Sequence, residues 1–306
     1  MTMKLVWMRG CATALVTPFK SDGTIDEERM RSLVDRQIKG GVQLLVPCGT
    51  TGESATMTEE EDARVIAMTI EVARGRAKVI AGTGSNSTAA AIEYSKRARD
   101  MGTDALLQVA PWYNKPTQEG LYAHFRAIAE AIPETPIMLY NVPGRTSSNI
   151  VAQTVLRLAR DCQNIVAIKE ASGNMTQIME ILRARPANFS VLSGDDAVTL
   201  PLIALGGKGI VSVASNEIPD LMSRMTELAL AGNWEEARAL HYRLLPLMEI
   251  NFIESSPGPV KAAMSMMGLL EENFRLPLVP IKEESRARIR EVITELGLLE
   301  SVHATA

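Results

Sequence analysis

Several classes of protein are excluded by what this sequence lacks. It has only three cysteines, which are far apart and not in CxxC spacing: Cys11, Cys48 and Cys162. This number and spacing indicate reduced thiols rather than a disulfide framework. No stretch approaches the ~18 unbroken apolar residues of a membrane span, and the N-terminal segment MTMKLVWMRG lacks the apolar core of a signal peptide. We therefore expect a cytoplasmic protein with no membrane partner.

Positive charge is also scarce. The 32 lysine and arginine residues are outnumbered by 36 acidic residues, the net charge is −4, and no basic run occurs. A nucleic-acid-binding protein needs a basic face that neutralises phosphates, so nucleic acid is not an expected partner. With 46% hydrophobic and 22% charged residues over 306 positions, the composition is that of a globular protein with a substantial core.

Metal and cofactor motifs are missing as well. The glycine-rich segment 82–87 lacks the third glycine of a dinucleotide fingerprint, and neither HExxH nor GxSxG occurs. The pair Asp195-Asp196 is interpreted as a helix cap rather than a metal site. The histidines do not cluster with cysteines or acidic residues and are interpreted as structural or exposed: His124, His241 and His303. We expect no cofactor and no metal.

What the sequence does contain is a regular alternation of eight short apolar runs with longer segments of helical periodicity. Each run is continuous rather than alternating, which is typical of strands buried on both faces of a parallel sheet. The runs occupy 11–19, 42–49, 78–84, 104–111, 136–143, 164–173, 189–196 and 209–216. Helices are expected between them at 27–40, 58–74, 87–101, 117–131, 151–160, 174–184 and 196–205. Thr58 and Glu61 predict a capping box at the start of the second helix.

After the eighth run the pattern contains only helices, which are expected at 217–231, 233–253, 257–270 and 283–296. Eight βα units without a long linker predict one closed (β/α)8 TIM barrel of the α/β class. The predicted organisation is a catalytic barrel at 1–231 followed by a C-terminal helical extension at 232–306.

Lys169 is the strongest candidate for a catalytic residue. Active sites of barrels lie at the carboxyl ends of the strands, and Lys169 follows the apolar part of the sixth run. Burial disfavours the charged form of an amine, and a neutral amine can attack a ketone to form an iminium. Tyr140 ends the fifth run, where a phenol can shuttle protons. Further hydroxyls could come from Thr50, Thr51 or Tyr113.

Two more features indicate sites for anions. Arg145 offers a planar fork for a carboxylate, and the amides and hydroxyls of the GTTG loop at 49–52 could hold another. Plainer interpretations exist for each residue: a snorkelling lysine, a packed tyrosine, an arginine in a surface ion pair, a tight turn. The grouping of all of them at neighbouring strand ends favours the catalytic interpretation.

Four segments carry a resemblance to a known family: GTTGES at 49–54, YNVPGRT at 140–146, IKEASG at 168–173 and SGDD at 193–196. In combination and order they resemble the dihydrodipicolinate synthases, within the wider pyruvate-dependent aldolases that include N-acetylneuraminate lyase. The resemblance extends from about residue 10 to 296. It implies a lyase that condenses pyruvate with L-aspartate 4-semialdehyde to 4-hydroxy-tetrahydrodipicolinate, in lysine and diaminopimelate biosynthesis. It also implies a homotetramer built as a dimer of tight dimers.

The resemblance implies a catalytic role for four residues. Lys169 would form the Schiff base, and Tyr140 would act as the general acid and base above it. Thr50 would link Tyr140 to Tyr113 in a proton relay. Tyr113 would reach this relay from the neighbouring subunit of a dimer.

It also implies a set of substrate-binding residues. Thr51, Gly194 and the backbone carbonyl of Val211 would line the pyruvate pocket. Arg145 would hold the carboxylate of the incoming aldehyde at the pocket mouth.

The sequence departs from the family where lysine-inhibited members bind their effector. Those members typically use a histidine, an asparagine, a glutamate and a tyrosine, and the corresponding residues here are Glu59, Asn86, Ala90 and Trp112. Only the asparagine matches, so weak or absent inhibition by lysine is expected.

Two other functions remain open from the residues. Another pyruvate aldolase or dehydratase acting on sugar acids, such as a neuraminate lyase or 2-keto-3-deoxy-gluconate aldolase, would share Lys169 and Tyr140. A non-catalytic barrel used as a small-molecule sensor would have no need of these two residues together with Thr50.

Overall fold

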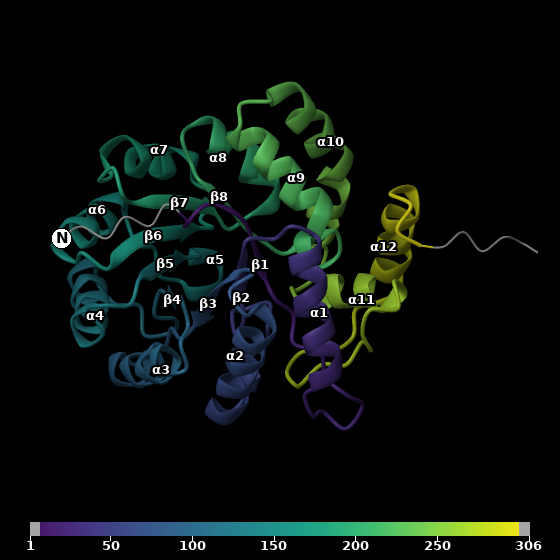
Figure 1. The fold of residues 1–306 in the computed structure, drawn as a ribbon, viewed down its shortest axis with the longest axis horizontal. Coiled ribbons are helices and arrows are strands. Elements are labelled where there is room, and N and C mark those ends of the chain that lie inside the picture. The colour runs from purple at the N-terminus through teal and green to yellow at the C-terminus, as the bar shows by residue number, and fades with distance from the viewer. Residues whose placement is uncertain (1–6, 300–306) are drawn as a thin grey trace, which may run out of the picture.

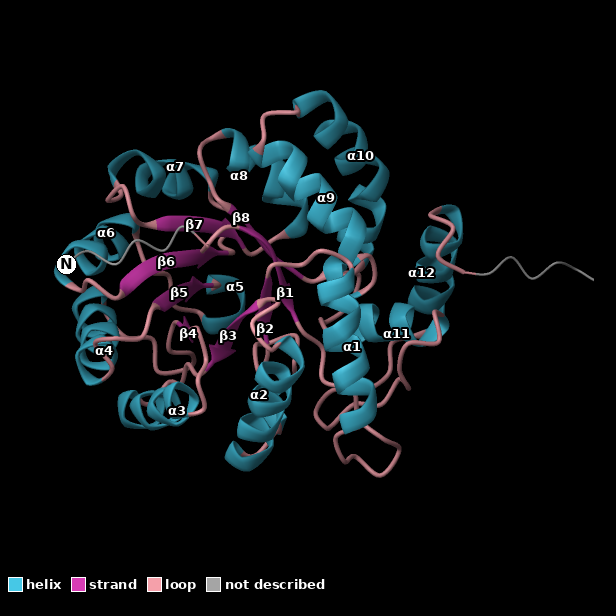
Figure 2. Ribbon diagram, in the orientation of Figure 1, coloured by secondary structure: helices cyan, strands magenta, loops and turns pink. Residues whose placement is uncertain are grey.

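The computed structural model describes residues 7–299, and in this part of the chain eight parallel strands close into a barrel (Figure 2). The strands follow one another around the barrel in sequence order, and β1 closes the ring by pairing with both β2 and β8. The predicted (β/α)8 TIM barrel is therefore confirmed. The strands are β1 Gly10–Ala14, β2 Leu44–Val46, β3 Lys78–Gly82, β4 Ala105–Val109, β5 Ile137–Asn141, β6 Ile165–Glu170, β7 Ser190–Ser193 and β8 Gly209–Ser212.

Alternate residues of each strand face the barrel interior or the surrounding helices. Along β5, Met138 and Tyr140 belong to the inner cluster of buried side chains, whereas Ile137 and Leu139 pack in the outer cluster against the helices. Both clusters are apolar, which explains why the strands read as continuous apolar runs. The same alternation directs Lys169 on β6 to the interior, because Ala167 two residues earlier belongs to the inner cluster.

Helices surround the barrel (Figure 1). The capping box predicted for α2 is present, since Thr58 accepts from the backbone N of Glu61 and the Glu61 carboxylate accepts from the backbone N of Thr58. Each helix begins and ends within a few residues of its predicted range. They are α1 Glu27–Lys39, α2 Glu59–Ala73, α3 Thr88–Asp100, α4 Gln118–Ala131, α6 Ala152–Asp161, α7 Met175–Ala184, α8 Thr199–Ala204 and α9 Pro219–Leu230.

Four short helical turns lie at the strand ends; three were not predicted, because they are too short to show periodicity, and the fourth, η2, lies inside the helix predicted at 196–205. Their bounds are η1 Ser54–Thr56, α5 Pro143–Thr146, η2 Asp196–Val198 and η3 Ala214–Asn216. The expected cap at Asp195-Asp196 is half right. Asp195 caps η2 through the backbone N of Ala197, but Asp196 instead accepts from the backbone N of Val213 and Ala214 at 3.0 Å.

Three helices follow α9: α10 Trp234–Ile250, α11 Gly258–Met266 and α12 Glu283–Glu295. The helix predicted at 257–270 ends four residues early, at Met266. His124 and His241 are both buried, whereas His303 lies outside the described residues. Within 7–299 no helix is long and apolar enough to cross a membrane.

Candidate active site

Lys169 and Tyr140 lie side by side at the carboxyl ends of β6 and β5. They are register partners in the barrel, and the Lys169 Nζ is 4.2 Å from the centroid of the Tyr140 ring. Only 5% of Lys169 and 6% of Tyr140 is exposed. A primary amine and a phenol, nearly excluded from solvent and in contact, are suited to nucleophilic attack coupled to proton transfer.

The pair faces a cavity of about 150 Å³, which is large enough for a small keto acid. Gly194 forms the wall beside Lys169. A Cβ at this position would come within 2.6 Å of the Ala171 Cβ and 3.1 Å of the Lys169 Cε. The absence of a side chain at Gly194 thus leaves the lysine room to reach a substrate.

The loop 49–54 forms another wall through Thr50 and Thr51. Thr51 is buried and Thr50 is exposed. A hydrogen bond fixes the loop, since the Thr17 hydroxyl donates to the backbone O of Gly52 at 2.7 Å. Two threonine hydroxyls beside an amine provide hydrogen-bond donors for a carboxylate.

Arg145 stands at the cavity mouth on α5. Its guanidinium is solvent-exposed and makes one long hydrogen bond, from Nη2 to the backbone O of Ser256 at 3.4 Å. No carboxylate in residues 7–299 forms an ion pair with it. Most of its donors therefore remain available for an anionic ligand.

Two of the predicted site residues, Tyr113 and Val211, do not line this cavity. Tyr113 does not line the cavity, and 88% of it is exposed. Val211 is fully buried in the inner cluster of the barrel, and Val213 lines the cavity instead. Sequence reasoning missed Phe252 and Ser256, which line the cavity from the segment after α10. They follow a helix rather than a strand, so the strand-end rule could not find them.

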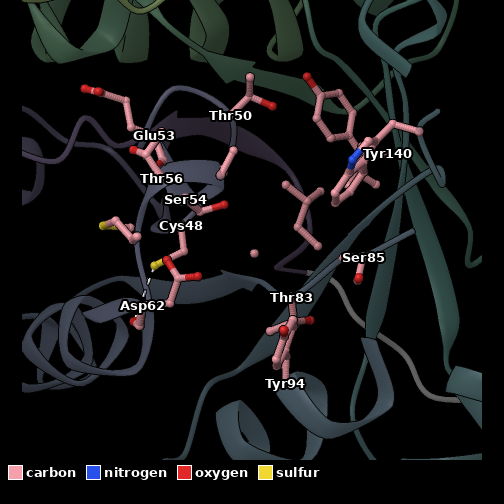
Figure 3. A pocket seen from close by; sticks show the side chains of 18 of the residues that line it. Cys48, Thr50, Glu53, Ser54, Thr56, Asp62, Thr83, Ser85, Tyr94 and Tyr140 are labelled. Carbon is pink, nitrogen blue, oxygen red and sulfur yellow. Dashed lines mark hydrogen bonds between the residues drawn. The ribbon is translucent and has the colours of Figure 1, made fainter. Parts of the chain in front are cut away.

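A larger pocket of about 570 Å³ adjoins the cavity and shares Thr50, Tyr140 and Arg145 with it. In Figure 3, Thr50 and Tyr140 lie along its upper edge, and Cys48 and Asp62 lie on the opposite side. The thiol of Cys48 donates to the backbone O of Asp62 at 3.4 Å. Burial raises the pKa of Asp62 to about 7. The larger pocket thus lies directly beside the cavity that contains Lys169.

The donor groups for a metal are dispersed. Over residues 7–299, no three histidine, cysteine, aspartate or glutamate side chains come together as a metal ligand set. All three cysteines are buried as free thiols.

The chain is similar in sequence and in fold to known proteins. A sequence model of the dihydrodipicolinate synthetase family matches residues 7–296. A protein of Koribacter versatilis named 4-hydroxy-tetrahydrodipicolinate synthase is 54% identical, over 96% of this chain and 98% of that protein. The dihydrodipicolinate synthase of Aquifex aeolicus superimposes with a TM-score of 0.94 at 44% identity, covering 96% of this chain and 100% of the other. The chloride-inhibited enzyme of Acinetobacter baumannii, crystallised with pyruvate, gives 0.93 at 43% identity, covering 95% and 100%.

Proposed function

Since the chain belongs to the dihydrodipicolinate synthetase family, we propose that it condenses pyruvate with L-aspartate 4-semialdehyde through a Schiff base on Lys169. The observation that carries this proposal is the buried contact of Lys169 with Tyr140 at the ends of two adjacent strands. The relative crystallised with pyruvate supports a keto acid as the first substrate.

The first half of the reaction uses Lys169 and Tyr140. The Lys169 amine attacks the C2 carbonyl of pyruvate, and the C2 oxygen leaves as water, which gives an iminium. The Tyr140 hydroxyl supplies and removes the protons that these steps require. Because the iminium withdraws electrons from C3, a C3 proton is lost and an enamine forms. Thr51 and the loop around it hold the pyruvate carboxylate.

In the second half, the enamine C3 forms a carbon–carbon bond to the aldehyde carbon of the semialdehyde, whose oxygen takes up a proton. The amino group of the semialdehyde then attacks C2, which breaks the bond from C2 to Lys169 and closes the ring. Arg145 holds the carboxylate of this second substrate at the mouth of the cavity. No carboxylate between residues 7 and 299 forms an ion pair with Arg145, which supports this role.

The relay beyond Tyr140 is proposed to run through Thr50 to Tyr113 of a neighbouring subunit. Tyr113 is 88% exposed and its neighbour Trp112 is 38% exposed, so both are available to a second copy of the chain. We expect a homotetramer built from such dimers. Val211, which is completely buried, is proposed to act only through its backbone carbonyl.

The chain is proposed to act in the cytoplasm as a catalytic barrel, 1–231, with a C-terminal helical extension, 232–306. Phe252 and Ser256 line the cavity from the extension, so it completes the site as well as covering the barrel. Residues 300–306 of the proposed extension lie outside the described structure.

We also propose that lysine inhibits this enzyme weakly or not at all. Glu59 already accepts a hydrogen bond from the Tyr94 hydroxyl at 2.9 Å, and Ala90 on α3 has no polar group for an ammonium ion. A dose–response assay should show little loss of activity at low-millimolar lysine. Half-inhibition at micromolar to low-millimolar lysine would contradict this expectation.

The function is tested by pyruvate consumption with L-aspartate 4-semialdehyde and a panel of sugar aldehydes run in parallel. Preference for the semialdehyde is expected. In the same assay, Arg145→Met should raise the KM for the semialdehyde and leave borohydride trapping of pyruvate unchanged. Preference for a sugar aldehyde would retain the chemistry at Lys169 and overturn the proposed second substrate.

A further inference from the structure

A buried polar network lies behind the Tyr140–Lys169 pair, on the outer side of the barrel. Asn141 follows Tyr140 on β5 and Glu170 follows Lys169 on β6, and these two residues are also register partners. Because side chains alternate along a strand, the pair that faces the cavity is backed by a pair that faces the helices. Asn141 is completely buried and Glu170 is 1% exposed.

The Glu170 carboxylate accepts hydrogen bonds from three residues. The backbone N of Ser172 donates to Oε1 at 2.8 Å, the Asn141 Nδ2 lies 3.2 Å from both oxygens, and the Gln177 Nε2 donates to Oε2 at 3.3 Å. Every one of these partners is a donor, so the position requires a group that only accepts. Burial raises the pKa of Glu170, and the hydrogen bonds from Ser172, Asn141 and Gln177 oppose this rise.

Asn141 extends the network to a loop and a helix. Its Oδ1 accepts from the backbone N of Ile150 at 2.9 Å, and its Nδ2 donates to the Asn149 Oδ1 at 2.9 Å. Asn149 in turn donates to the Gln177 Oε1 on α7 at 2.9 Å. These side-chain hydrogen bonds thus add to the backbone pairing of β5 and β6, in which the backbone N of Ala171 donates to the backbone O of Asn141 at 2.9 Å, and they connect the strand ends to two outer elements.

Pairing at the other end of these strands is irregular. Ile137 pairs with Ile165 but Met138 pairs with Ala167, so the register shifts by one residue at the start of β5. A slip of one residue further along would turn Lys169 out of the barrel. From Met138 with Ala167 to Asn141 with Glu170 the register is regular, and the network lies at this regular carboxyl end.

We propose that Glu170 is a positioning residue, whose buried acceptor-only carboxylate fixes the ends of β5 and β6 so that Lys169 and Tyr140 stay in contact. The inference rests on the proposed function, since it assigns Glu170 a role through those two residues. Glu170 itself does not line the cavity.

The test is the variant Glu170→Gln, which keeps the shape but presents an amide NH2 to partners that are themselves donors. The measured quantity is the rate of borohydride trapping of pyruvate as a function of pyruvate concentration. We expect the saturating rate to fall about tenfold or more, because sub-ångström misplacement of reacting groups is costly. The half-saturating concentration should change less than about twofold, since pyruvate is held mainly by the loop 49–54.

A matched control is Glu217→Gln. Glu217 is also completely buried, burial raises its pKa too, and its Oε2 accepts from the Asn251 Nδ2 at 2.7 Å. It does not line either pocket, so this variant should trap pyruvate at the rate of the parent protein. A uniform loss in both variants would indicate general destabilisation and overturn the positioning role.

The remaining outcomes separate the two proposals. If the parent protein fails to trap pyruvate on Lys169, the proposed function fails. If the parent traps and Glu170→Gln traps equally fast, only the role of Glu170 fails. Should Glu170→Gln not fold, Gln177→Ala removes one donor to the carboxylate and should lower the saturating rate several-fold, and an unchanged rate would contradict the proposal.

Discussion

At the scale of single residues, Gly194 shows how a missing side chain serves the site. An added Cβ would lie 2.6 Å from the Ala171 Cβ and 3.1 Å from the Lys169 Cε, so the side chains of these two residues or the backbone would have to shift. Gly194→Ala should therefore displace the lysine and lower the rate of borohydride trapping by about a hundredfold. Gly144→Ala is the control, because its Cβ would meet nothing within 4 Å beyond its chain neighbours and the backbone of its own helix. Equal trapping rates in both variants would refute this account.

His124 predicts a pH dependence of stability. It is 6% exposed, and burial lowers its pKa from 6.5 to about 4. In the unfolded chain His124 therefore binds a proton near pH 6.5, whereas in the folded chain it binds one only near pH 4. Stability is complete above pH 6.5 and falls as the pH drops toward 4, by on the order of 3 kcal/mol.

Urea unfolding at pH 7 and pH 4.5 measures this effect. His124→Gln should lose less stability between the two values than the parent protein does, because its side chain does not titrate. The hydrogen bond between the Thr88 hydroxyl and the His124 Nδ1, 2.9 Å long, can be kept by the glutamine amide. Identical losses in the two proteins would show that other groups control the acid response.

At the scale of elements, a buried ion pair joins the loop 49–54 to α11. The Lys261 Nζ donates to the Glu53 Oε1 at 2.6 Å, to the backbone O of Thr17 at 3.1 Å and to that of Asn273 at 2.6 Å. Neither side chain of the pair is exposed. Lys261→Met should cost about 3–5 kcal/mol, because it leaves the Glu53 carboxylate buried without a counter-charge.

Chemical denaturation of three variants tests this. Lys261→Met combined with Glu53→Gln should recover much of the loss, since no buried charge then remains. Arg64→Ala breaks an ion pair with Glu27 whose side chains are 51% and 44% exposed, and it should destabilise the protein much less than Lys261→Met does, because solvent screens an exposed pair. If Lys261→Met costs no more than Arg64→Ala, the pair does not anchor the loop.

The elements themselves were largely predictable from the sequence, because strand and helix patterns differ over the length of each element. Each of the eight apolar runs overlaps a strand, and the capping box at Thr58 and Glu61 marked the start of α2 correctly. What could not be predicted depends on contacts between distant segments. Phe252 reaches the cavity from a helix end, and Asp196 caps backbone N–H groups after β8 rather than its own helix.

The candidate site divides in the same way. Strand ends and a family resemblance together indicated four residues that line the same cavity: Lys169, Tyr140, Thr51 and Gly194. Family membership and the barrel are confirmed by the comparisons and the topology. The network behind Lys169 left no sequence signal, because Asn141, Glu170 and Gln177 come together only when two strands and a helix pack.

At the scale of the whole molecule, contacts within one chain do not explain why the segment around Tyr113 holds an exposed tyrosine in an unusual backbone conformation. Tyr113 and Lys115 both have positive φ angles, 73° and 46°, which non-glycine residues seldom adopt. The segment is held in this form by Asn114, whose Nδ2 donates to the backbone O of Asn86 at 2.9 Å. Strained backbone that is fixed by its surroundings is typical of functional positions. An exposed tyrosine held this way fits the proposed contact with the site of a second chain.

Co-expression of two defective variants tests whether Tyr113 acts across subunits. Lys169→Ala has no Schiff-base lysine but supplies Tyr113, and Tyr113→Phe lacks the relay hydroxyl but keeps Lys169. Each homodimer should be nearly inactive. In a mixed dimer, the site that retains Lys169 receives the intact Tyr113 of its partner, so one of its two sites is complete.

If equal amounts of the two chains assemble at random, half of the dimers are mixed. Activity should then recover to about a quarter of that of the parent protein, because a twofold dimer offers two equivalent sites. Mixing the separately purified variants without exchange of subunits provides the control and should give no recovery. Activity in the co-expressed sample that only equals the mean of the two variants would mean that Tyr113 serves its own chain or plays no part in the relay.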